Sequence, residues 1–187
     1  MNGILKKTNN DIAHGIDSLI HQITDLVAQG RAQVRQSVNH VMVQTYWQIG
    51  CLIVEYEQQG AERAAYGKQQ LQRISAELTQ RLGKGFDTRN LRNMRSFYLM
   101  FQNWNAVRTE LSWTHYRVLL RVENAHARDW YLQEAIEQNW SARALERQIQ
   151  KLYYERLLAS KDKAPVEAEA QAHTQPLAES AKDYLRD

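Results

Sequence analysis

Apolar residues recur every three or four positions along most of the chain, which is the spacing of helices with one apolar face. Two such stretches cover residues 16–29 and 34–58, and Gly30 between them either ends the first helix or only bends it. Five more helices are expected close to residues 68–82, 91–101, 112–120, 126–136 and 141–158. No stretch alternates apolar and polar residues long enough to predict a strand. The pattern therefore predicts an all-α fold, a helical bundle without a sheet.

Serine and glycine positions mark several of the expected helix ends. Ser112 and Ser141 each precede an apolar-periodic stretch, where a serine side chain can cap the first free N–H groups of a helix. Gly83 and Gly85 permit a tight turn, and Asp87 or Thr88 can cap the helix that follows it. With the helix at 68–82 before it, this segment is typical of a helix-turn-helix element.

The helix after this turn has two different faces. At about 100° per residue, one side is apolar and the other carries guanidinium, amide and hydroxyl groups. The apolar side consists of Leu91, Met94, Tyr98 and Phe101, and the polar side of Arg89, Arg92, Asn93 and Ser96.

Two interpretations of the polar side remain open. Guanidinium and amide groups suit phosphate oxygens and base edges, so this side could bind DNA, with Arg81 and Lys84 near the phosphate backbone. An arginine-rich outer face is also common as a plain solvated surface. The candidate nucleic-acid-binding residues are Arg81, Lys84, Arg89, Arg92, Asn93 and Ser96.

Charge is distributed unevenly along the chain. The net charge is +3, with +6 in residues 61–160, −1 before this range and −2 after it. A basic middle is what a surface that faces an anionic partner needs. It favours the DNA interpretation without excluding a solvated surface.

Composition indicates a cytoplasmic protein without membrane contact. No apolar run approaches the roughly 18–20 residues needed to cross a bilayer. Residues 1–10 lack the apolar core of a secretory signal. The single cysteine, Cys51, cannot form an internal disulfide, as expected in a reducing compartment.

The sequence shows no pattern typical of a metal, cofactor or catalytic site. The six histidines form no His-Glu-x-x-His arrangement, and no Cys-x-x-Cys, phosphate-binding loop or nucleophile motif is present. His115 could act as a base, but its position is more typical of a half-buried histidine with a backbone partner. A metal-dependent nuclease needs clustered carboxylates followed by a lysine, which the helical region lacks. We therefore expect no cofactor, no metal and no catalysis by this chain.

The character of the chain changes after Ser160. Residues 161–181 contain both prolines, no aromatic residue, and repeated alanine, glutamate and glutamine. Such a segment is expected not to bury a face and is typical of a linker or tail. The predicted organisation is a disordered N-terminus at 1–13, a helical domain at 14–159 and a linker or tail at 160–187.

Four motifs occur in an order that resembles one bacterial protein family. They are Val38-Asn39 with residues 46–50, Tyr66-Gly67 with residues 85–98, residues 111–115, and residues 139–149. Over roughly residues 16–158 they resemble the N-terminal domain of YhcG-type proteins, a domain of unknown function that precedes a PDDEXK nuclease domain. Tyr66 stands where the family usually has tryptophan, and Ala144 where it usually has glutamate.

The resemblance implies a domain that serves a nuclease. A domain fused to a nuclease often supplies targeting, which implies DNA as the partner. It can equally dimerise the nuclease or bind another protein, and then an apolar face of residues 16–58 or 142–158 would be buried against a second copy. The nuclease half of the family is absent from this chain, so the cleavage that the family implies is not carried over to it.

Overall fold

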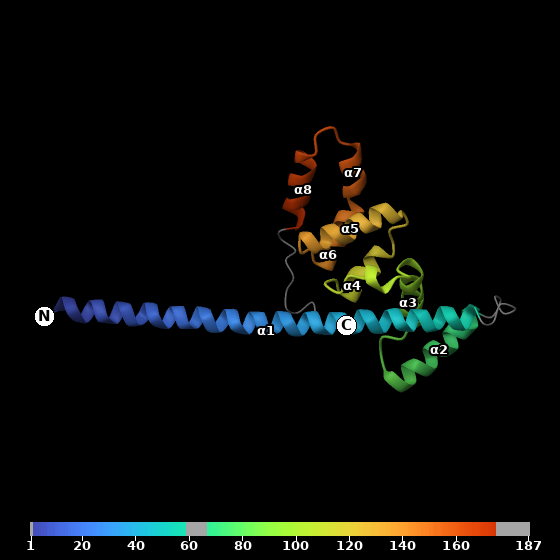
Figure 1. The fold of residues 1–187 in the computed structure, drawn as a ribbon, viewed down its shortest axis with the longest axis horizontal. Coiled ribbons are helices and arrows are strands. Elements are labelled where there is room, and N and C mark those ends of the chain that lie inside the picture. The colour runs from blue at the N-terminus through green and yellow to red at the C-terminus, as the bar shows by residue number, and fades with distance from the viewer. Residues whose placement is uncertain (1, 59–66, 175–187) are drawn as a thin grey trace. The chain divides into compact units, whose positions relative to one another are not determined.

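The computed structural model describes residues 2–58 and 67–174 (Figure 1). Within these residues it contains α-helices and a 3-10 turn but no strand, which confirms the all-α prediction. The helices are α1 (Asn2–Gln58), α2 (Gly67–Leu82), α3 (Thr88–Met100), α4 (Trp113–Leu119), α5 (Ala125–Glu137), α6 (Ala142–Gln150), α7 (Tyr153–Ala159) and α8 (Ala164–Thr174), with the 3-10 turn η2 at Trp104–Ala106. None of the described helices is both long and apolar enough to cross a membrane.

The chain divides into two compact units, Met1–Val38 and Asn39–Asp187. In the first unit α1 begins at Asn2 and passes through Gly30 without a break, so the helices predicted at 16–29 and 34–58 are one helix. A Cβ atom built on Gly30 would meet nothing within 4 Å, so this glycine lies in open space.

An aromatic cluster on α3 and α4 forms the centre of the second unit. Phe97 is fully buried, and its ring centroid lies 4.6 Å from that of Tyr116 and 5.5 Å from those of Trp113 and Phe101. Trp47, on the part of α1 in this unit, donates a hydrogen bond from Nε1 to the Phe101 carbonyl oxygen at 2.7 Å. These contacts hold α1, α3 and α4 together around one core.

The second half of α1 crosses α3 at Gly50 with the two backbones in contact. A Cβ atom added at Gly50 would lie 2.1 Å from the carbonyl oxygen of Met94 and 2.9 Å from the Cβ of Tyr98. Only a residue without a side chain fits this crossing. Its close approach places α3 firmly against α1.

The helix predicted at 141–158 is two helices. Ser141 caps α6 as predicted, its Oγ accepting a hydrogen bond from the Ala144 N–H at 3.1 Å. After α6, Leu152 adopts a positive φ of 53° and α7 starts at Tyr153. The apolar spacing continues across Leu152, so it gave no sign of the break.

The expectation that residues 161–181 bury no face is wrong for α8. Ala170 is buried, and its carbonyl oxygen accepts a hydrogen bond from Gln148 Nε2 at 2.8 Å. Arg156 of α7 forms an ion pair with Glu169. Figure 1 shows α7 and α8 side by side. Small alanine side chains let α8 approach α6 closely, so a segment of low hydrophobicity still packs. The domain boundaries predicted at residues 13 and 159 stay predictions.

Candidate nucleic-acid interface

The predicted turn between α2 and α3 has the geometry that its glycines suggest. Gly83 and Gly85 have φ of 88° and 108°, in the left-handed region that favours glycine. Of the two predicted caps, Asp87 is the one used, since its carboxylate accepts hydrogen bonds from the N–H groups of Arg89 and Asn90 at 2.9 and 3.0 Å. That α2, the turn and α3 form a helix-turn-helix element stays a prediction, and so does the reading of DNA by it.

The inner side of α3 is wider than the sequence indicated. Leu91, Met94 and Phe97 have no exposed surface, while Tyr98 is half-buried with its ring centroid 5.0 Å from that of Trp47. The sequence pattern missed Phe97, which lies between Met94 and the predicted polar side. The buried side therefore extends toward Asn93.

The structure separates the six predicted site residues into two groups. Lys84, Arg89 and Arg92 are exposed, and none of the three forms an ion pair with another described residue. Asn93 and Ser96 are half-buried beside the arginines on α3. Arg81 differs from all of these, because its Nη2 lies 3.2 Å from Glu77 Oε2 one turn earlier on α2. Around the turn and the first half of α3, Lys84, Arg89 and Arg92 therefore have no carboxylate partner among the residues that the structure describes.

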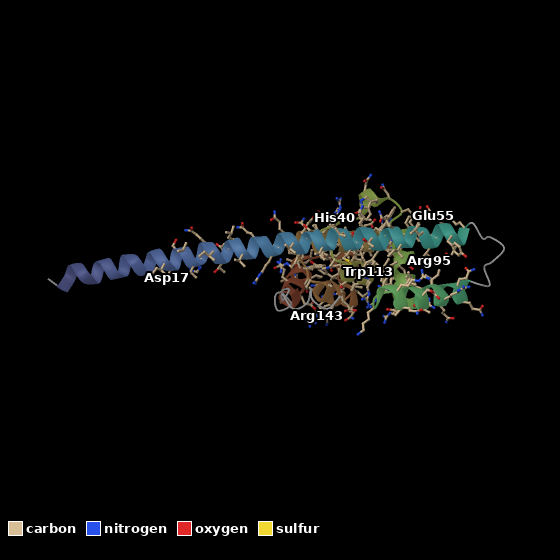
Figure 2. All side chains as sticks on the ribbon, turned by 90° about the horizontal axis from the view of Figure 1, so that it is seen from below. Asp17, His40, Glu55, Arg95, Trp113 and Arg143 are labelled. Atoms are coloured by element: carbon tan, nitrogen blue, oxygen red, sulfur yellow. The ribbon has the colours of Figure 1, made fainter. Side chains whose placement is uncertain are left out.

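Two further residues of α3 hold it in place. Arg95, labelled in Figure 2, donates from Nε to Glu57 Oε2 at 2.7 Å and so ties α3 to the end of α1. Asn90 donates from Nδ2 to the Gly85 carbonyl oxygen at 2.6 Å and accepts from Trp113 Nε1 at 3.1 Å. Asn90 therefore joins the turn, α3 and α4. Its partner Trp113 lies 23 positions away in sequence, and no local pattern signals this contact.

His115 is built into the core rather than placed to act as a base. Its Nε2 lies 2.9 Å from the Trp140 carbonyl oxygen, and its Nδ1 lies 2.7 Å from Ser112 Oγ and 3.3 Å from the Ser112 N–H. Because a carbonyl only accepts, the proton belongs on Nε2, and Nδ1 accepts. Burial lowers the pKa of His115 below its ordinary value, which keeps this neutral form. Among the described residues, no group of three or more His, Cys, Asp or Glu side chains could hold a metal ion.

The family model of the DUF1016 N-terminal domain matches residues 22–156, a range that includes α2, the turn and α3. The chain belongs to the DUF1016 N-terminal domain family. This match confirms the resemblance drawn from the four sequence motifs. The chain is also similar to "Putative nuclease YhcG" of Escherichia coli (strain K12), with 38% identity over 195 aligned positions. No solved structure matches the chain.

The relative corrects one prediction. The alignment covers 86% of this chain and 51% of the relative, so the chain spans about half the length of the curated relative it matches. The expectation that the chain is not an enzyme is overturned by this match, because the relative carries the name of a nuclease. The lack of a familiar motif is therefore no ground for calling this chain non-enzymatic.

Proposed function

We propose that the domain binds DNA through the outer side of α3 and the turn before it. The observation that carries this proposal is the difference between the arginines of the region. Arg89 and Arg92 are exposed and form no ion pair within the described residues, whereas Arg81 and Arg95 each bind a carboxylate. A guanidinium that has no carboxylate partner stays available for charge-assisted hydrogen bonds to phosphate.

Charge and relationship support the same ligand class. Residues 61–160 carry a net charge of +6, which attracts a polyanion. The name of the relative from Escherichia coli, a nuclease, supports nucleic acid as the ligand. The alternative, a dimerisation or protein-interaction module, is compatible with DNA binding because helix-turn-helix proteins commonly bind DNA as dimers.

The cap of α3 limits how a phosphate can approach. The Asp87 carboxylate already accepts from the first N–H groups of α3, so the end of this helix offers negative charge to an incoming anion. Contact with DNA would therefore come from side chains along the helix. In this arrangement Arg89 and Arg92 contact the duplex, Asn93 and Ser96 flank them, and Lys84 and Arg81 lie near the phosphates.

The test is the binding of a labelled DNA duplex at several salt concentrations. Binding is measured by fluorescence anisotropy, with a chelator present. Each phosphate contact contributes about 0.9 to the slope of log K against log salt concentration. The double variant Arg89→Ala/Arg92→Ala should bind more weakly and lose up to about two units of that slope. Its circular dichroism spectrum should match that of the parent, because both side chains are exposed.

A matched variant removes the same charge elsewhere. Arg117→Ala/Arg121→Ala takes two arginines from α4 and the turn after it, where Arg121 already pairs with Glu146 at 2.6 Å. This variant should bind DNA nearly as well as the parent. If both double variants weaken binding equally, or if Arg89→Ala/Arg92→Ala binds as tightly as the parent, α3 is a solvated surface. Single-stranded DNA and RNA of the same sequence show whether the duplex is the preferred form.

A further inference from the structure

The first unit exposes an apolar stripe along α1. Seven large apolar side chains of this unit, each between 47% and 70% exposed, make up the stripe. We define the α1 stripe as Ile16, Leu19, Ile20, Ile23, Leu26, Val27 and Val34. Asp17, labelled in Figure 2, marks this part of the helix.

The spacing of the α1 stripe is that of a coiled coil. Steps of four and three residues lead along the chain through positions that share one side of the helix, namely Ile16, Ile20, Ile23, Val27, Gly30 and Val34. Alternating steps of this kind mark the core positions of paired helices. A contiguous apolar surface of this extent is typical of an interaction site, because its exposure to water is unfavourable and is relieved by burial against a partner. Helices of this kind gain most of their stability from a packed apolar face.

We propose that the α1 stripe packs against the same stripe of a second copy of this chain, with the two helices antiparallel. A two-fold axis between residues 23 and 27 places Ile16 opposite Val34 and Ile23 opposite Val27 in both directions. It also places Ile20 opposite Gly30. Glycine is unfavourable inside a helix, yet Gly30 has open space where a Cβ would be. In this register that space receives the larger Ile20 of the other copy.

Charge beside the stripe specifies both the partner and its direction. Asp17 and Arg31 lie two heptads apart on the same flank of the stripe. In an antiparallel pair each flank of one helix faces the equivalent flank of the other helix. Asp17 of each chain therefore faces Arg31 of the other. In a parallel pair this flank would instead face the opposite one, which carries Leu19, Leu26 and Gln33 and no charge. Both charges of this pair, Asp17 and Arg31, come from the same sequence. A second copy of the chain therefore supplies the complementary charges, and no other protein is needed.

The area of the stripe suits a reversible dimer. Seven half-exposed apolar side chains offer roughly 600 Å² per copy, or about 1,200 Å² in total, which is the lower end of the range for stable interfaces. For the experiments below we take a dissociation constant of about micromolar order as the expected value, because the interface is small and reversible.

The first experiment is sedimentation velocity of the full chain across roughly two decades of concentration around that value. The parent should shift from monomer to dimer. Ile23→Glu places a carboxylate in the apolar centre of the interface and should weaken the dimer by at least about a hundredfold. Tryptophan fluorescence verifies that the second unit of each variant is folded, because all five tryptophans lie in that unit. The helical signal in circular dichroism verifies that α1 remains a helix.

Charge exchange tests the direction. Asp17→Arg or Arg31→Asp alone turns two attractions into two repulsions and should weaken the dimer by roughly tenfold. The double variant Asp17→Arg/Arg31→Asp restores the attraction and should return to the parental affinity. Asp25→Arg is the matched control, because Asp25 lies on the side of the helix opposite the stripe, and it should dimerise as the parent does.

Each possible result decides the proposal. A chain that stays monomeric at every concentration overturns it, and so does a dimer that tolerates Ile23→Glu. A dimer that is insensitive to the single charge reversals overturns the antiparallel arrangement. Arg89→Ala/Arg92→Ala should dimerise normally, so failure of the dimer and failure of DNA binding are measured separately.

Discussion

Replacing Gly50 by alanine tests the crossing that positions α3. The added methyl group would lie 2.1 Å from the Met94 carbonyl oxygen and 2.8 Å from its carbonyl carbon. Ordinary contact begins at 3.4 Å, so the two backbones would have to separate by about 1.3 Å. The nearest atoms belong to the backbone of a helix, which cannot move aside as the end of a flexible side chain can.

The cost follows from that separation. Inserting a methyl group into a packed interior costs about 1–3 kcal/mol, and a clash with backbone belongs at the upper end of this range. A gap of up to 1 Å also removes a quarter to a half of the dispersion energy of each contact across it. Against this, alanine is favoured over glycine in a helix by about 1 kcal/mol. We expect the free energy of unfolding of the second unit to fall by about 2 kcal/mol.

Urea denaturation followed by tryptophan fluorescence measures this loss. The tryptophans are at positions 47, 104, 113, 130 and 140, so the signal comes from the second unit alone. The midpoint should fall by about 1 M at an unchanged slope. Gly30→Ala is the matched control: it makes the same replacement in α1 at a glycine of the first unit with no neighbour within 4 Å, and should leave this transition unchanged. A Gly50→Ala variant as stable as the parent would refute the close crossing.

Three further predictions concern stability. The pKa of His115 is lowered in the folded state, so the unfolded chain binds a proton first as the pH falls, and the free energy of unfolding should decrease below about pH 6.5. Melting temperatures measured at several pH values should show this decrease in the parent and lack it in His115→Gln. Asn90→Ala leaves the Trp113 N–H without its partner and should cost about 2 kcal/mol in urea denaturation. Ala170→Glu places a charge against α6 and should expose α8 to limited proteolysis, whereas Ala172→Glu, at an exposed position, should not.

The sequence predicts those features of the fold that depend on neighbouring residues, such as helix caps and the buried side of a helix. Asp87 and Ser141 cap their helices because each follows a turn and precedes an apolar-periodic stretch. The inner residues Leu91 and Met94 follow from helical spacing alone. These features depend on neighbours three or four positions away, which a single sequence shows.

Features that depend on distant partners could not be predicted in this way. The contact of Asn90 with Trp113 and the crossing of Gly50 with Met94 join residues far apart in the chain. The break between α6 and α7 at Leu152 uses a positive φ without glycine, so no residue type signals it. The DNA-contacting role of the α3 arginines, the linker role of residues 160–187 and the cytoplasmic location stay predictions.

The residues that position α3 are different from those proposed to bind DNA, so the two roles can be tested separately. Gly50, Asn90 and Arg95 face other helices and set where α3 lies, while Arg89 and Arg92 face outward and contribute little to that placement. A change in the first group should lower stability and DNA affinity together. A change in the second should lower affinity alone, with the melting temperature within about a degree or two of the parent. If Arg89→Ala/Arg92→Ala also destabilises the fold, those arginines are part of the packing, and the loss of binding no longer argues for a DNA interface on α3.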